Sequence, residues 1–249
     1  MPKFTLVKLG TVASTQLWVK EHLHEIPQKE WLVVTAEQQT AGVGTCDRSW
    51  YSPVGNVYVS LATRLFDPHK TQYTQITALS VAQMLEQFGV RPQIKWVNDV
   101  LLQGKKISGV LAEIVTNAKR ENFLVIGVGI NVNLQTVTVP SLLNTITSLA
   151  LEQKCHFDLE QVLTVFLHFF TRNMDDYLQN RDLLNLTQQI TRRLTTKVGE
   201  EIMVMFDDKV IEGIFLGLDP TGQLKLQIAD KVIVINHGSV INANYLANL

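Results

Sequence analysis

Alternating apolar and polar residues recur along the first part of the chain, and longer apolar patterns with helical spacing lie among them. The period-two alternation predicts strands at 4–9, 31–36, 56–63, 93–96, 100–102, 106–115 and 123–133. The helical spacing predicts helices at 72–88, 140–151, 158–178 and 182–194, and Ser14-Thr15 is a typical start for one more. This mixture predicts an α+β fold, a mixed β-sheet with flanking helices.

The apolar pattern after residue 195 is that of short strands alone. They are predicted at 202–206, 210–218, 224–228 and 232–236, and Asp219-Pro220-Thr221-Gly222 is a strong turn signal between two of them. Short strands with turn residues at close intervals are typical of a small β-barrel or sandwich, and the barrel is our prediction. We therefore predict two domains, 1–195 with the mixed sheet and 196–249 with the barrel.

Composition and charge exclude several classes of protein. The formal net charge of the 249 residues is −1, without long runs of either sign, which argues against a nucleic-acid surface or a basic membrane patch. No apolar stretch is long enough for a signal peptide or a membrane span, so a cytoplasmic protein is expected. Cys46, Cys155 and the six histidines have no metal-ligand spacing, which predicts free thiols and no protein-ligated metal.

The most informative segment is Lys95-Trp96-Val97-Asn98-Asp99, followed closely by the segment from Lys105 to Glu113. Together they place a tryptophan, an amide, a carboxylate and lysines within a short stretch. If Gln103-Gly104 is a two-residue hairpin turn, Asp99 and Lys106 lie diagonally on one face of the hairpin. That arrangement fits a site where a carboxylate meets a nucleotide phosphate, and it equally fits a salt-bridged hairpin in solvent.

The predicted strand 123–133 has one face without large side chains. Ile126, Val128, Ile130 and Val132 point one way, and Gly127, Gly129, Asn131 and Asn133 point the other way. Glycines in a strand often mark the close approach of a ligand or of another backbone. A flat ring over Gly127 and Gly129, with Asn131 hydrogen-bonding at its edge, is one interpretation. Tight packing against a crossing helix is the other.

A long polar segment, from Glu37 to Pro53, has no periodicity and is predicted to be a loop. Gly42-x-Gly44 is by itself a weak phosphate signal, because no Walker-type lysine follows it. Arg48 is a candidate contact for phosphate, and Trp50 is a candidate stacking partner for a base. The alternative is an ordinary surface loop with Trp50 packed inward.

Taken together, these segments resemble the biotin–protein ligases, also called biotin–[acetyl-CoA-carboxylase] ligases. Lys95 to Asp99 is similar to the family's Lys-Trp-Pro-Asn-Asp, and Lys105 to Glu113 to its Lys-Lys-x-x-Gly-Ile-Leu-x-Glu. Ile126 to Asn131 resembles its Ile-Gly-x-Gly-Ile-Asn, and Ser14-Thr15 the first two residues of its Ser-Thr-Asn. The loop from Glu37 to Pro53 matches the family's loop in its length and in the residues at its two ends. The resemblance covers the whole chain and includes the C-terminal barrel.

The resemblance implies a two-step reaction in which biotin and ATP give biotinyl-5′-adenylate, and a lysine of a biotin carboxyl carrier protein then takes the biotinyl group. ATP, Mg²⁺ bound to it, and biotin are the small molecules expected, and 1–195 is then the catalytic domain. The implied catalytic residues are Lys106, Asp99 and Arg48. The implied biotin contacts are Ser14, Thr15, Gln39, Gly42, Gly44, Lys106, Gly109, Gly127 and Gly129. The implied adenylate contacts are Arg48, Trp50, Asn98 and Asn131. A monomer or a homodimer, of the type without a DNA-binding domain, is expected.

The loop departs from the family pattern. Where the family has Gly-Arg-Gly-Arg-Arg-Gly-Arg, this chain has Gly42-Val43-Gly44-Thr45-Cys46-Asp47-Arg48. A lost charged hydrogen bond to phosphate costs about 1.5–3 kcal/mol. Gln16 replaces the family's asparagine, and Val97 its proline. A biotin-binding homologue with little or no catalysis is therefore one alternative, and a lipoate or octanoate ligase or transferase of related fold is another.

Overall fold

The computed structural model describes residues 3–27, 30–45, 48–65, 70–180 and 184–241. A seven-stranded sheet forms the larger part of the molecule, with the strand order β1-β2-β3-β7-β6-β5-β4. β1 and β2 are parallel, and the other neighbouring strands are antiparallel. The strands are β1 Phe4–Val12, β2 Trp31–Gln39, β3 Val57–Arg64, β4 Gln93–Lys95, β5 Asp99–Leu102, β6 Lys105–Thr116 and β7 Asn122–Ile130. The predicted mixed sheet with flanking helices is confirmed.

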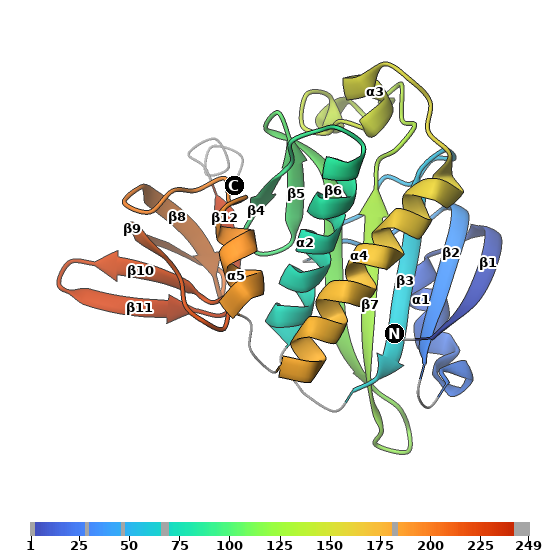
Figure 1. Ribbon diagram of the computed structural model, residues 1–249, viewed down its shortest axis with the longest axis horizontal. Helices are drawn as coiled ribbons and strands as arrows, with labels where there is room; N and C mark the ends of the chain where they lie inside the picture. The colour runs from blue at the N-terminus through green and yellow to red at the C-terminus, as the bar shows by residue number, and fades with distance from the viewer. Residues whose placement is uncertain (1–2, 28–29, 46–47, 66–69, 181–183, 242–249) are drawn as a thin grey trace.

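Two long helices, α2 Lys70–Gln87 and α4 Leu159–Asn180, lie side by side across one face of this sheet (Figure 1). The main core lies between these helices and the sheet, and β7 contributes the even-numbered residues Leu124, Ile126, Val128 and Ile130 to it. The short helices are α1 Thr15–Glu21, η1 Leu23–Glu25, η3 Pro140–Leu142, α3 Leu149–Gln153 and α5 Leu184–Thr191. Burial of apolar side chains on this face is the main source of stability in such a layer.

Helix α1 packs on the sheet through a second, smaller core. This core contains Val19 from α1, Leu32 and Val34 from β2, and Phe123 and Val125 from β7. Because side chains alternate across a strand, Gly127 and Gly129 share the face of Phe123 and Val125, away from α2 and α4. The α1 face of the sheet therefore carries the glycine positions that the sequence singles out.

Three local predictions differ from the structure. The predicted helix at 140–151 is wrong, because η3 ends at Leu142 and α3 begins only after its N-cap, Ser148. Strand β7 ends at Ile130 instead of 133. In the hairpin, Leu101 pairs with Lys106, but a register shift between Val100 and Leu101 (a β-bulge), which a regular two-residue hairpin does not have, pairs Asp99 with Gly109.

The C-terminal strands form a separate sheet with the order β11-β10-β9-β8-β12. Its strands are β8 Glu201–Phe206, β9 Lys209–Leu218, β10 Leu224–Ile228, β11 Lys231–Ile235 and β12 Ser239–Ile241. The prediction of a closed barrel is not confirmed, because in the described part of the chain β11 and β12 are open edges. The turn at Gly222 contacts the larger part of the molecule. The Gly222 carbonyl accepts hydrogen bonds from Gln75 Nε2 of α2 at 2.6 Å and from Trp96 Nε1, just after β4, at 3.2 Å.

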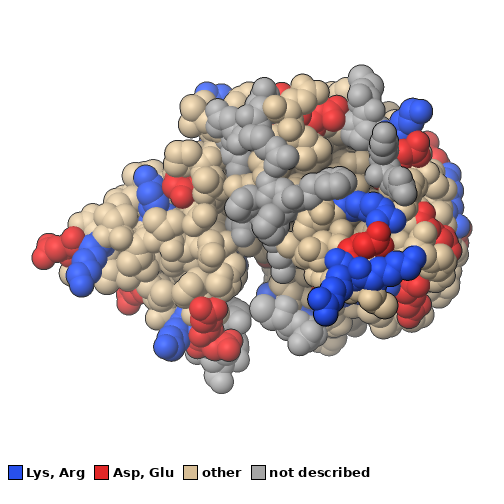
Figure 2. Space-filling model, turned by 90° about the horizontal axis from the view of Figure 1, so that it is seen from below, with Lys and Arg blue, Asp and Glu red and all other residues tan. Residues whose placement is uncertain are grey.

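Charged side chains of both signs are interspersed on the face shown in Figure 2, in keeping with the small net charge. Across the described ranges, no helix combines the length and the apolar character that crossing a membrane requires.

Candidate functional site

The start of α1 and the end of β2 are joined by hydrogen bonds. Ser14 caps α1, since its hydroxyl accepts a hydrogen bond from Gln16 N at 3.2 Å. The backbone N–H and the hydroxyl of Thr15 both donate to Gln39 Oε1, at 2.9 and 3.2 Å. Gln39 Nε2 donates to Ser52 Oγ at 2.9 Å. These contacts bring Ser14, Thr15 and Gln39 together, as the sequence predicts, and attach them to the loop that follows β2.

The same loop places Trp50 on the sheet. Its indole covers Gly129: a Cβ at this glycine would lie 2.8 Å from Trp50 Cζ2 and would overlap Nε1. At Gly109 a Cβ would lie 3.0 Å from both Trp50 Cζ3 and Lys106 Cε. Trp50 Nε1 is buried and has no hydrogen-bond partner among the described residues. The flat ring that lies over Gly129 of β7 is thus the chain's own indole. This agrees with the alternative that Trp50 packs inward.

Lys106 and Asp99 form the charged part of the site. Lys106 Nζ lies 2.6 Å from Asp99 Oδ1 and 5.2 Å from the centroid of the Trp50 ring. Both side chains are partly exposed, at 29% and 21%, but the Oδ1 atom of Asp99 is buried. The diagonal contact of Asp99 and Lys106 predicted from the hairpin is therefore present, even though the bulge changes the register.

Two further residues of the Lys95–Asp99 segment support this pair. Asn98 Nδ2 donates to Val110 O at 3.0 Å, which fixes the segment against β6. Lys95 pairs with Asp99 across β4 and β5. Burial lowers the pKa of the Lys95 ammonium below its usual range, opposed by the Asp99 charge and reinforced by Lys106 and Arg48. The site thus gathers several positive charges around one carboxylate.

A cavity of about 40 Å³ lies between α1, the loop and the strands β6 and β7. That volume holds about three waters, too few to match a bicyclic ring. Its lining includes the predicted residues Ser14, Thr15, Gln39, Gly44, Trp50, Asn98, Lys106, Gly109, Gly127 and Gly129. It also includes Gln16, Val43, Thr45, Val110, Leu111 and Val128, which were not predicted as contacts. Most of the predicted site residues therefore meet around one cavity.

The other predicted site residues lie outside this lining, and Asp99 is one of them. Gly42 faces the inside of its loop, where a Cβ would lie 2.5 Å from Ser52 Oγ. The Arg48 side chain is exposed and donates to Thr45 O at 3.2 Å and to Thr45 Oγ1 at 3.1 Å. Asn131 is buried and donates to Thr147 O at 3.0 Å, instead of pointing at the edge of a ring on β7. Cys46 and Asp47 of the same loop lie outside the described residues.

The missed residue with the largest role in the geometry is Gln16. Its side chain lies over Gly127, where a Cβ would be 2.7 Å from Gln16 Oε1. The sequence signal was present: Gln16 follows the capping Ser14-Thr15 pair on the first turn of a helix. No group of three or more His, Cys, Asp or Glu side chains in the described ranges is placed to bind a metal ion.

Comparison with protein-family models gives two matches. Residues 9–131 match the biotin/lipoate A/B protein ligase family, and residues 197–241 match the biotin protein ligase C-terminal domain. Among curated proteins, the bifunctional ligase/repressor BirA of Bacillus subtilis is 34% identical over 230 residues, covering 89% of this chain and 69% of BirA. The biotin–[acetyl-CoA-carboxylase] ligase of Mycobacterium tuberculosis is 24% identical over 220 residues, covering 85% and 79%.

Solved structures give a similar result. The biotin protein ligase from Aquifex aeolicus in complex with biotin and ATP superposes with a TM-score of 0.83 at 27% identity, covering 95% of this chain and 97% of that one. A mutant of the same Aquifex protein in complex with biotin also has a TM-score of 0.83, at 26% identity.

Proposed function

This chain belongs to the biotin protein ligase family and is a ligase, and from that premise we propose that it joins biotin to a carrier protein through biotinyl-5′-adenylate. The single observation that supports this best is Lys106, which lines a cavity whose floor is formed by Gly109, Gly127 and Gly129 (the glycine floor) and is paired with Asp99. In the proposed site Lys106 is the cation at the point where a carboxylate and a phosphate meet. A mixed anhydride forms only when two anions are brought together, so a fixed cation is the first requirement.

In the first proposed step, an oxygen of biotin's carboxylate attacks the α-phosphorus of ATP. The new P–O bond gives the adenylate, and the α–β bond breaks to release pyrophosphate. Lys106 Nζ binds the carboxylate and offsets the charge that builds up at phosphorus. Its partner Asp99 lies 2.6 Å away and is proposed to hold the ammonium in position.

In the second proposed step, the neutral amine of a carrier lysine attacks the carbonyl carbon of the adenylate. An amide bond forms, AMP leaves with the former carboxylate oxygen, and the amine loses a proton. Asp99 is our candidate for orienting that amine. The acceptor implied by the relatives named biotin–[acetyl-CoA-carboxylase] ligase is a biotin carboxyl carrier domain.

The remaining assignments follow the cavity. Ser14, Thr15 and Gln39, with the backbone of Gly109, Gly127 and Gly129, are proposed to surround biotin. Trp50, Asn98, Arg48 and Asn131 are proposed to serve the adenylate. Arg48 and Asn131 require a rearrangement for that, because their side chains now bond to Thr45 and Thr147. Mg²⁺ is assigned to the nucleotide phosphates and receives no protein ligands.

Ligand entry is proposed to require Trp50 to move. The indole covers Gly129, and the remaining space is too small for biotin. Moving the indole breaks no hydrogen bond at its ring nitrogen, because Trp50 Nε1 has no partner among the described residues. Biotin would replace the indole on the glycine floor, and the released Trp50 would be free to stack on the adenine.

The test is a carrier-labelling assay with biotin, ATP and a biotin carboxyl carrier domain, run beside the same assay with lipoate. We expect transfer of biotin and ATP-dependent release of pyrophosphate. Tight biotin binding in isothermal titration without pyrophosphate release would instead identify a non-catalytic binding protein. Transfer of lipoate in preference to biotin would replace the proposed substrate.

A further inference from the structure

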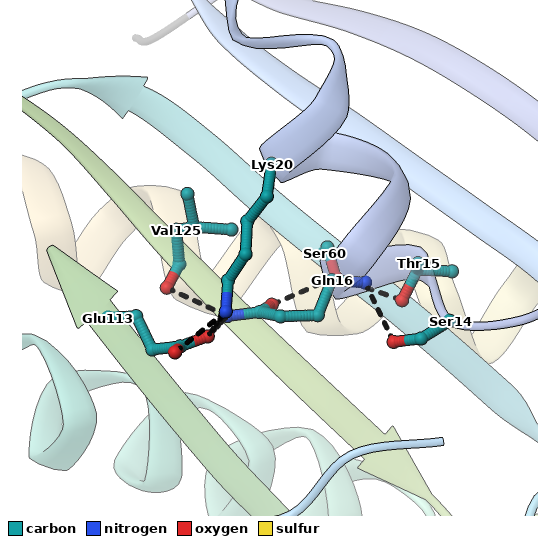
Figure 3. A network of polar contacts seen from close by, with 7 residues as sticks. All are labelled: Ser14, Thr15, Gln16, Lys20, Ser60, Glu113 and Val125. Atoms are coloured by element: carbon teal, nitrogen blue, oxygen red, sulfur yellow. Dashed lines mark hydrogen bonds and ion pairs between the residues drawn. The ribbon is translucent and has the colours of Figure 1, made fainter. Parts of the chain in front are cut away.

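Gln16 closes one end of the cavity and is held there by a buried polar network. The residue is 3% exposed and lies on the first turn of α1. Figure 3 shows its side chain reaching from α1 toward Glu113, Val125 and Ser60, with Lys20 descending from the same helix to the same carboxylate. All these residues come from α1 and the strands beneath it. The amide is therefore positioned by contacts with several elements.

The network fixes which way the amide faces. Gln16 Nε2 donates to Glu113 Oε2 at 2.8 Å and to Val125 O at 3.4 Å, and both of these atoms only accept. Lys20 Nζ lies 2.7 Å from Glu113 Oε2 and compensates its charge. The reversed amide would set Gln16 Oε1 against the carboxylate. Oε1 therefore points the other way, toward Ser60 Oγ at 3.2 Å and the cavity.

The oxygen stands directly over the backbone of β7. A Cβ at Gly127 would be 2.7 Å from Oε1 and 3.3 Å from Cδ. Gly129, beneath Trp50, is about 6.6 Å further along the strand at 3.3 Å per residue. Lys106 adjoins Gly109, which pairs with Gly129. The cavity thus has a cationic end at Lys106 and an amide-oxygen end at Gln16, with the glycine floor between them.

We infer that Gln16 is a specificity-determining residue for the ring of the ligand. Its Oε1 accepts a hydrogen bond from a ring N–H, and its length limits how large the ring over Gly127 can be. The inference rests on the proposed function, in which the carboxylate lies at Lys106 and the ureido ring of biotin reaches Gln16. A ring that lacks N–H groups leaves this oxygen without a donor from the ligand. A ring whose N–H is methylated collides with it.

The experiment compares Gln16→Met and Gln16→Asn with the natural chain by isothermal titration. Gln16→Met keeps the length and removes the acceptor, so biotin binding should weaken about 10-fold or more. Gln16→Asn keeps the acceptor but is one methylene shorter. It should weaken biotin binding and strengthen binding of biotin methylated on a ureido nitrogen. The matched control is Gln83→Met, since Gln83 is a buried glutamine on α2, and it should bind biotin as the natural chain does.

A double-mutant cycle tests the orienting role of Glu113. Glu113→Gln offers a donor to either end of the Gln16 amide, so it should weaken biotin binding in the natural chain and have no further effect in the Gln16→Met variant. Additive effects on binding would mean that Glu113 acts independently of Gln16 and would contradict the orienting role, and thermal melting of each variant shows whether folding is affected.

The inference is overturned if Gln16→Met binds biotin as tightly as the natural chain while Gln16→Asn still rejects the methylated analogue. If the natural chain itself does not bind biotin, it is the proposed function that fails, and the two failures are thereby distinguished. If Gln16→Met does not fold, the comparison of biotin with its methylated analogue in Gln16→Asn decides alone.

Discussion

Replacing Lys106 by methionine tests the proposed chemistry most directly. Methionine keeps most of the stem that packs against Gly109 and the Trp50 ring, and it removes only the charge. The side chains of Lys106 and Asp99 are only 29% and 21% exposed, and Asp99 Oδ1 is buried. Removing one partner of such a pair costs about 1–3 kcal/mol, between the value for a surface pair and that for a buried one. We therefore expect the midpoint of thermal unfolding to fall by about 2–12 °C.

The effect on catalysis is separate from the loss of stability and is measured on folded protein. A charge-assisted hydrogen bond to an anion is worth about 1.5–3 kcal/mol, which corresponds to about a 10- to 150-fold loss in the rate of adenylate formation. Asp99, now without its partner, adds repulsion toward both biotin and ATP. The double variant Lys106→Met/Asp99→Asn should therefore recover part of the loss.

The assay is pyrophosphate release with biotin and Mg-ATP, followed by carrier labelling from synthetic biotinyl-5′-adenylate. Lys106→Met should be impaired in the first measurement far more than in the second. The control is Lys105→Met, because Lys105 is the adjacent lysine and does not line the cavity. Pyrophosphate release at the natural rate in Lys106→Met would refute the assignment, and equal losses in both measurements would move the role of Lys106 to the transfer step.

Three other variants have expected outcomes. Gly129→Ala should force the Trp50 indole off the sheet, seen as a red shift of tryptophan fluorescence with about 1–3 kcal/mol lost in chemical unfolding. Val43→Arg combined with Thr45→Arg restores cations to the cavity rim and should slow the escape of the adenylate about 10-fold or more, measured by its dissociation rate. Gly222→Ala, at φ +82° and against Gln75, should lower the free energy of unfolding by about 1–3 kcal/mol.

Most of the main sheet could be predicted from the sequence, because alternation and glycine positions are local signals. The bulge between Val100 and Leu101 could not, since an extra residue in a strand leaves the alternation on either side intact. The segment 140–151 has helical spacing, yet Asn131 O accepts from Leu149 N and Lys106 N donates to Thr145 O. Tertiary hydrogen bonds of this kind override a weak local preference, and no local pattern encodes them.

The same distinction, between local sequence signals and contacts made by tertiary packing, explains which parts of the candidate site could be predicted. The contact of Lys106 with Asp99 and the shared face of Gly127 and Gly129 were predicted because each pair lies on one hairpin or one strand, whereas their roles in a site came from the family resemblance. Gln16 meets Glu113 only through the packing of α1 on the sheet, and the sequence separation of these residues carries no signal of that contact. The sequence also left open whether Trp50 or a ligand covers β7. That choice depends on the competition between the two for one glycine floor, which is a property of the folded site.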